Sequence, residues 1–171
     1  MVICSQIGRL LRLSRWLMLS LLFATACTGD VPSDSACGKL VYTDAGVARA
    51  DYLPCAGEMI AALDALAPQA TAALGGDARA RSDGQSTLRR VHALMRAAGG
   101  RKLLDRWGDR PLTDLNLHIS NAVTKYDAFY MVRILDATSP YAAQSRQAAE
   151  SELSGAKSAS EDARRLYRRL Q

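Results

Sequence analysis

The chain has 171 residues and a formal net charge of +5. Its first 26 residues hold three arginines and no acidic residue, so the other 145 carry 19 basic against 17 acidic side chains, a balance that argues against a nucleic-acid binder. A segment of 145 residues suffices for one domain with a single core. Aromatic residues make up only 6% of the chain and β-branched runs are short, which favours an all-α protein over a β-sandwich or barrel.

The N-terminal segment has the pattern of a bacterial secretory signal. Arg9, Arg12 and Arg15 form a basic region, and residues 16–23 that follow are apolar apart from one serine. This apolar run is about half as long as the roughly 20 residues that a membrane-spanning helix needs. We therefore expect residues 1–26 to be a cleaved signal peptide and not a membrane anchor.

The end of this segment resembles the lipobox of bacterial lipoproteins, in which small residues precede an acylated cysteine. Residues 24–27, Ala-Thr-Ala-Cys, match that arrangement, except that the class usually has Leu in the place of Ala24. The resemblance implies a lipid on Cys27. Because Thr28 is not the Asp associated with inner-membrane retention, it also implies an outer-membrane lipoprotein that faces the periplasm. Ala24 and Ala26 suit ordinary signal peptidase as well, which would leave a soluble periplasmic protein.

The cysteine count bears on these alternatives. The exported chain would retain Cys27, Cys37 and Cys55 in an oxidising compartment, and an odd number cannot pair completely within one chain. If Cys27 carries a lipid, the count closes with one disulfide between Cys37 and Cys55. The alternative is a free or intermolecular thiol at Cys27. A disulfide that closes so short a loop would stabilise the fold by about 3 kcal/mol.

The residues after the signal are expected to form a tether and then a stapled loop. Residues 27–36 are small and polar, include Pro32 and present no apolar face, which predicts a flexible tether to a helical domain over 37–171. Inside the loop between the two cysteines, the apolar residues 40–42 precede the turn-like residues 43–46. This pattern predicts a short strand followed by a turn.

A first helix is predicted to begin between Asp51 and Pro54. Asp is a good N-cap, and Pro is tolerated in the first turn of a helix. Apolar residues at spacings of three and four then mark one buried face, which comprises Met59, Ile60, Leu63 and Leu66. We expect the helix to kink or end at Pro68 and the segment to close at Gly75 and Gly76.

A polar segment and two shorter helices are predicted next. Residues 77–86 are polar and contain Gly84, which predicts a loop. A second helix is expected from Ser86, as a possible cap, to the glycine pair at 99–100. Its inward residues are Leu88, Val91, Leu94 and Met95. A short third helix is expected over 102–107.

The last two predicted helices form a long antiparallel hairpin, which completes a bundle of about four to five helices. The fourth helix should begin at 111–113, and the pair Ser139-Pro140 should provide the stop that follows it. Its apolar stripe comprises Leu115, Ile119, Ala122, Val123, Tyr126, Phe129, Tyr130 and Leu135. Its aromatic residues could line a ligand groove, but we expect them in the core. The fifth helix should run from about Tyr141 to the end of the chain. Its inward residues repeat in a heptad: Ala149, Leu153, Ala156, Ser160, Ala163, Tyr167 and Leu170.

The fifth helix also carries the candidate partner surface. Small residues would let a neighbouring helix approach closely, and the cations suit an acidic partner, peptidoglycan carboxylates or an anionic lipid headgroup. This surface comprises Ala149, Ala156, Ala163, Arg164, Arg165, Arg168 and Arg169. The alternatives are an internal seam for the alanines and stabilisation of the helix C-terminus by the arginines.

Few residues suggest chemistry. The sequence has no glycine-rich phosphate loop, nucleophile elbow or Cys-x-x-Cys pair. His118 follows Asp114 by four residues, so the two could share a metal or position a proton. We expect a plain side-chain contact or surface pair instead, because metal sites assemble three or four ligands. Asp105, Asp109 and Asp114 alternate with arginines and are interpreted as a solvated surface. We therefore expect no catalytic residue, metal or cofactor.

These features favour a lipid-anchored, non-catalytic helical module that binds another envelope protein. Secretion pilotins are similar in size, in address and in sometimes holding a disulfide, although this resemblance is one of architecture only. The alternative is a small-ligand or stress-related binding protein with a pocket between helices. An enzyme that uses Asp114 and His118 is the third hypothesis. A pocket that encloses a ligand would favour the second, and a shallow groove the first.

Overall fold

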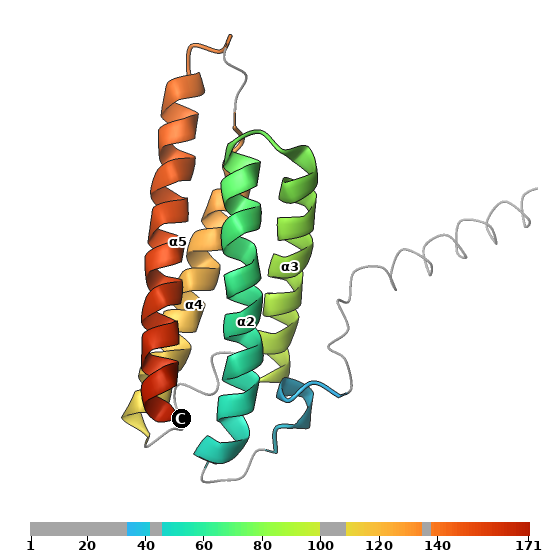
Figure 1. Ribbon diagram of the computed structural model, residues 1–171, viewed down its shortest axis with the longest axis vertical. Helices are drawn as coiled ribbons and strands as arrows, with labels where there is room; N and C mark the ends of the chain where they lie inside the picture. Colours follow the sequence, from blue (N-terminus) through green and yellow to red (C-terminus); the bar gives the residue numbers. More distant parts are fainter. Residues whose placement is uncertain (1–33, 42–45, 100–108, 135–137) are drawn as a thin grey trace, which may run out of the picture. The chain divides into compact units, whose positions relative to one another are not determined.

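Four long helices run alternately up and down, side by side, in a computed structural model that describes residues 34–41, 46–99, 109–134 and 138–171 (Figure 1). A short 3-10 turn precedes them. The elements are η1 (Cys37–Lys39), α2 (Arg49–Leu74), α3 (Ala78–Ala97), α4 (Arg110–Met131) and α5 (Ala142–Leu170). The all-α bundle with an antiparallel α4–α5 hairpin is therefore confirmed. The expected signal peptide, Cys27 and the expected third helix over 102–107 lie outside the described residues.

Helix α2 is longer than its sequence predicted. It begins at Arg49, shortly before the predicted start, and continues through Pro68 without a break. Contrary to one expected alternative, the helix does not end at Pro68, and the segment closes at the predicted glycine pair. The amide of Gly75 donates to the carbonyl of Thr71, and Gly76 has a φ of 99°, a conformation that glycine adopts without strain.

The predicted loop over 77–86 is wrong, because α3 begins at Ala78. The side chain of Asp77 accepts a hydrogen bond from the amide of Ala80 and caps the helix. Gly84 is buried against the hydroxyl group of Tyr130, where a larger residue would collide. Tertiary contacts therefore hold a polar segment in a helix.

Helix α4 starts at the predicted position but ends earlier than predicted. Asp109 caps it, and Pro111 occupies the first turn. The helix stops at Met131, where Arg81 of α3 donates hydrogen bonds to the carbonyls of Tyr130 and Val132 at 2.8 and 3.0 Å. These bonds satisfy carbonyls that a longer helix would have used, so the chain leaves the helix well before Ser139-Pro140. Leu135 lies outside the described residues.

Small residues of α5 are buried in the seam between α4 and α5. Ala149, Ala156 and Ala163 of α5 are fully buried, and Leu153 and Ser160 are buried with them. On α4, the expected apolar stripe is buried throughout its described part, and its aromatic residues belong to the core. The predicted heptad is thus correct. The three alanines form an internal seam and are not an accessible partner surface.

The disulfide fixes the start of the chain's folded part. Cys37 and Cys55 are bonded and buried, with their Cα atoms 4.5 Å apart. Ser35, which was expected in the flexible tether, is only 6% exposed and bonded to α2, so the fold already includes the last residues of that segment. Leu40 and Val41 lie outside helices and strands, contrary to the predicted strand. The predicted turn residues 43–45 lie outside the described part.

Candidate functional site

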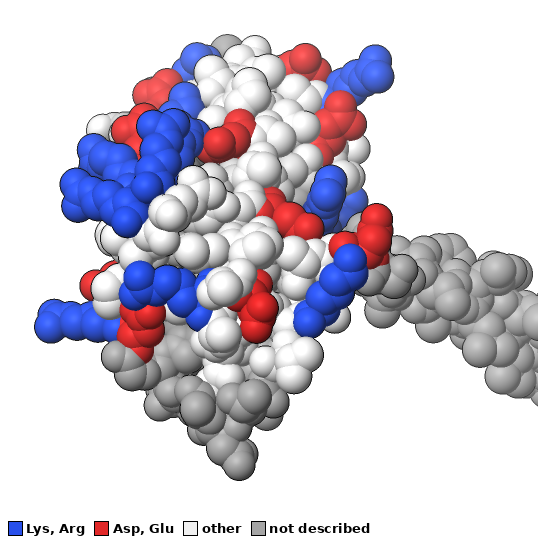
Figure 2. All heavy atoms as spheres, turned by 60° about the horizontal axis from the view of Figure 1, so that its bottom comes forward, with Lys and Arg blue, Asp and Glu red and all other residues white. Residues whose placement is uncertain are grey.

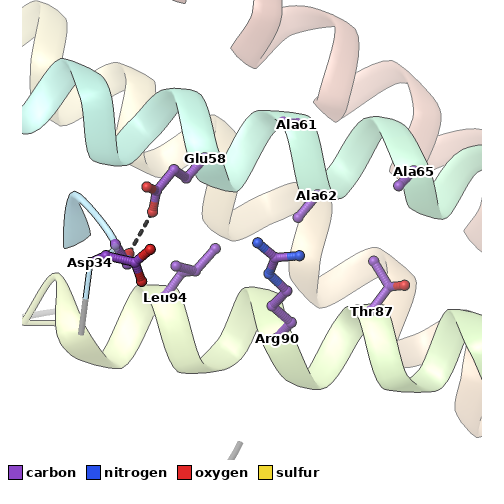
Figure 3. A pocket seen from close by; sticks show the side chains of 9 residues that line it. Asp34, Glu58, Ala61, Ala62, Ala65, Thr87, Arg90 and Leu94 are labelled. Atoms are coloured by element: carbon purple, nitrogen blue, oxygen red, sulfur yellow. Dashed lines mark hydrogen bonds between the residues drawn. The ribbon is translucent and has the colours of Figure 1, made fainter. Parts of the chain in front are cut away.

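A surface hollow of about 390 Å³ lies between α2 and α3, beside the first described residues of the chain (Figure 3). Three alanines of α2 line one wall: Ala61, Ala62 and Ala65. Opposite them lie Thr87, Arg90 and Leu94 of α3. Asp34, Ser35 and Glu58 line the rest of it. The hollow is open to solvent, so it suits a ligand that lies on the surface.

The sequence of α2 explains the hollow. Ala61 and Ala65 are one helical turn apart and both are exposed, although each lies beside a neighbouring helix. Their methyl groups are too short to reach α3. On α3, Leu94 is buried, whereas Arg90 is exposed. The space between the two helices therefore stays unfilled over this stretch.

Glu58 ties the start of the folded chain to α2. The Ser35 hydroxyl donates to Glu58 Oε2 at 2.5 Å, and the Ala36 amide donates to Oε1 at 2.9 Å. Burial alone would raise the pKa of Glu58. The hydrogen bonds from Ser35 and from the amides of Ala36 and Cys37, together with the charge of Arg90, outweigh burial and lower the pKa. The carboxylate is thus ionised, and both its oxygens are engaged.

Arg90 supplies the positive charge of the hollow. Its guanidinium extends from α3 across toward α2 (Figure 3). Within the described part of the chain, it takes part in no hydrogen bond and no ion pair, and it acts on Glu58 only through its charge. The Thr87 hydroxyl beside it donates to the carbonyl of Asp83 at 3.1 Å and keeps its oxygen as an acceptor. The guanidinium can therefore hold a carboxylate from outside in bidentate geometry.

Of the two expected arrangements of Asp114 and His118, a side-chain contact and a surface pair, the structure lacks the contact. In the described part no hydrogen bond or ion pair joins them, and Asp114 is exposed. The other histidine has such a partner, because His92 Nε2 lies 2.9 Å from Asp127 Oδ1 and links α3 to α4. No group of three or more His, Cys, Asp or Glu side chains among the described residues is arranged to hold a metal ion.

Asp109 is not simply a solvated charge next to its neighbouring arginines. Arg49, sixty residues earlier, donates to Asp109 Oδ2 through Nε at 2.9 Å and Nη2 at 2.7 Å. The same aspartate caps α4. Asp109 therefore connects the starts of α2 and α4. Asp105 lies outside the described residues.

The four C-terminal arginines divide into two kinds. Arg164 pairs with Asp64 of α2, and Arg165 pairs with Asp162 in its own helix. Arg168 and Arg169 are exposed and have no hydrogen bond or ion pair among the described residues. Only these last two remain wholly available to a partner.

Neither Glu58 nor Arg90 was predicted from the sequence as a site residue. They lie 32 positions apart on different helices, and Ser35 comes from the segment expected to be a tether. No spacing along the chain relates the three. The one available signal is the group of alanines on α2, which the sequence shows without indicating what faces it.

Comparison with known proteins gives no relative for this chain. No protein-family model, no curated protein and no solved structure matches it significantly. Of the helices that the structure describes, none has the length and apolar character needed to cross a membrane.

Proposed function

We propose that the chain is a lipid-anchored, non-catalytic helical module of the bacterial envelope, which binds an acidic segment of another envelope protein. The binding site is the hollow between α2 and α3. Arg90 takes a carboxylate of the partner, and the alanine wall accepts apolar side chains next to it. The anchor is a lipid on Cys27, and the domain faces the periplasm from the outer membrane.

The unpaired guanidinium of Arg90 in the hollow carries this proposal. An exposed arginine on a helix usually projects into water, whereas Arg90 extends toward Ala62 on the neighbouring helix. A carboxylate that binds there displaces little protein structure and gains two parallel hydrogen bonds. Because the hollow is open, it suits a peptide segment that continues beyond both ends.

Site-specific photo-crosslinking in cells tests the site. A photoreactive amino acid at Ala65, which is exposed on the wall of the hollow, should yield a discrete crosslinked species. The matched control is Ser158, which is an exposed position on α5 away from the hollow. Equal crosslinking from both positions, or from Ser158 alone, would contradict the proposed site.

The anchor is tested separately. Cys27→Ser should abolish acylation, detected as the loss of the lipid mass from the mature N-terminus. If ordinary signal peptidase then cleaves the precursor, the protein should move from the membrane fraction to the soluble periplasmic fraction. A protein that stays membrane-bound after Cys27→Ser would contradict anchoring through this residue.

A small zwitterionic ligand is the second candidate for the same hollow. The carboxylate of Asp34 and the guanidinium of Arg90 line one space, so they suit the ammonium and carboxylate groups of an amino acid. Thermal-shift measurements with free amino acids test this alternative. Stabilisation by a zwitterion that Arg90→Gln abolishes would favour it over a protein partner.

A further inference from the structure

The proposed anchor would hold one end of the bundle close to the membrane. Only seven Cα-to-Cα steps separate Cys27 from Asp34, where the described fold begins. Even a fully extended chain of that length spans no more than about 25 Å. A lipid on Cys27 therefore confines the domain to a thin layer beside the bilayer surface, so that a weak membrane contact acts at high effective concentration.

The end of α5 lies at the same end of the bundle as the first described residues (Figure 1). Both pack on the beginning of α2. Ser35 bonds to Glu58, and a Cβ atom on Gly57 would lie only 2.6 Å from the hydroxyl oxygen of Tyr167. The last turns of α5 thus lie at the end of the bundle where the described chain begins.

This end of α5 is rich in uncompensated cations. Figure 2, which brings that end of the molecule forward, shows a dense group of basic side chains on its left. Arg168 and Arg169 lack partners among the described residues, as noted above. Between α4 and α5, a second open hollow of about 360 Å³ is lined by His118, Asp162, Arg165, Leu166 and Arg169. Asp162 compensates Arg165, so Arg169 supplies the net charge there.

We propose that the last two turns of α5, Arg165, Arg168 and Arg169, dock on the headgroups of anionic phospholipids. The phosphodiester of one lipid occupies the hollow beside His118, where Arg169 and Arg165 donate to its oxygens. Arg168 lies on the other side of the helix, next to α2, and contacts a neighbouring headgroup. This docking rests on the membrane anchoring proposed above, and it would leave the hollow between α2 and α3 to the protein partner.

Vesicle binding without the lipid anchor tests this docking. All described residues belong to one compact unit, Val31–Gln171, so a chain that starts at residue 27 with Cys27→Ser retains the whole core. It should bind vesicles of phosphatidylglycerol and phosphatidylcholine but not vesicles of phosphatidylcholine alone, and added salt should weaken the binding. Replacing Arg168 and Arg169 together with Gln should weaken it about 25-fold, or about fivefold for each charge.

The control removes the same charge at the opposite end of the bundle. Arg79, in the first turn of α3, and Arg133, just after α4, are both exposed. Changing both to Gln should leave vesicle binding unchanged. Equal losses in the two double variants would mean that net charge alone attracts the protein, which would overturn the proposal.

Two further outcomes would also overturn it. A shift of the NMR signals of His118 with inorganic phosphate, without vesicle binding, would assign the hollow to a soluble phosphate compound. Fewer crosslinks to an envelope protein in the variant with both Arg168→Gln and Arg169→Gln, with vesicle binding intact, would assign the arginines to an acidic protein. Because the assay uses unacylated protein, its result is independent of whether Cys27 carries a lipid.

Discussion

Two groups of alanines in this molecule have opposite environments. On α5, Ala149, Ala156 and Ala163 are fully buried against other helices, whereas Ala61 and Ala65 of α2 are exposed in a hollow. The residue type is the same, and both groups follow helical spacing. The difference lies in what faces them.

The facing helix decides which alanines are covered. Against α5, α4 presents a broad apolar stripe whose aromatic side chains are buried. Against Ala61 and Ala65, α3 presents Thr87 and the charged Arg90, which do not fill the space. A small residue on one helix therefore only permits another helix to approach closely. A buried seam forms where the facing helix has large apolar side chains.

The largest expected effect on stability concerns the disulfide between Cys37 and Cys55. Replacing Cys37 and Cys55 together with Ser should lower the free energy of unfolding by about 3 kcal/mol, because the unfolded chain regains the entropy of the open loop. Thermal or urea denaturation measures the loss. Amides of the α4–α5 seam that exchange through global unfolding should lose protection by the same free energy. Cys27→Ser, which lies outside the described fold, is the control and should leave stability unchanged.

Replacing one buried and one exposed alanine with Leu tests whether the two groups differ in packing. Ala156→Leu forces extra methylene groups into the buried seam and should cost about 1–3 kcal/mol. Ala61→Leu places the same groups in the open hollow and should change stability by less than about 0.5 kcal/mol. Chemical denaturation of both variants measures the difference. Similar losses at the two positions would show that the hollow is closed in solution.

Gly84 and Gly155 allow a similar comparison, between a position where an added Cβ atom collides and one where it fits. A Cβ on Gly84 would collide with the Tyr130 hydroxyl, so Gly84→Ala should cost about 1–2 kcal/mol after the helix propensity of Ala is counted. A Cβ on Gly155 meets only the flexible Lys125 side chain at 3.4 Å, so Gly155→Ala should gain about 0.5–1 kcal/mol.

The pKa of Tyr130 provides a second measurement of the contact between Gly84 and Tyr130. Burial, with Tyr126 nearby, raises the pKa of Tyr130 to about 12. In Gly84→Ala the displaced hydroxyl becomes more exposed, and its pKa should fall toward the ordinary value, which absorbance during alkaline titration detects. Unchanged stability and titration in Gly84→Ala would contradict the close packing of α3 on α4.

The smallest effect on stability is expected at Glu58. Because its pKa is lowered in the folded protein, its contribution is present in full above the ordinary carboxyl pKa of about 4.3 and is lost as the pH falls through the folded value. Glu58→Gln should cost about 0.5–1 kcal/mol at pH 7, a modest loss because solvent screens this partly exposed group. The difference from the original protein should vanish near pH 3. A pH-independent difference would indicate lost packing and not a lost charge.

Sequence periodicity predicted the parts of the fold that depend on one continuous apolar face. The heptad of α5, the stripe of α4 and the glycine end of α2 are of this kind. It failed at residues 77–86, where the buried Gly84 and the hydrogen bonds of Arg81 sustain a polar helix. The partner in those contacts, Tyr130, belongs to α4 and lies far along the chain. The composition of residues 77–86 therefore does not indicate them.

The candidate site was beyond sequence reasoning for a related physical reason. Asp114 and His118 were singled out because four residues of spacing place them on one helical face, yet they do not bond. The side chains of Glu58 and Arg90 line one hollow only because α2 and α3 pack side by side. Proximity within one helix can be calculated from spacing, whereas proximity between helices depends on the register of their packing.

Charge reversal at Arg90 tests whether its guanidinium binds the partner. Arg89 is the matched control, because it is the adjacent arginine on the same helix, is exposed and bonds to Ser86 outside the hollow. With the photoreactive residue at Ala65, Arg90→Glu should abolish the crosslinked species in cells, whereas Arg89→Glu should retain it. Equal crosslink yields in the two variants would contradict the account, because binding would then not depend on the guanidinium that faces the hollow.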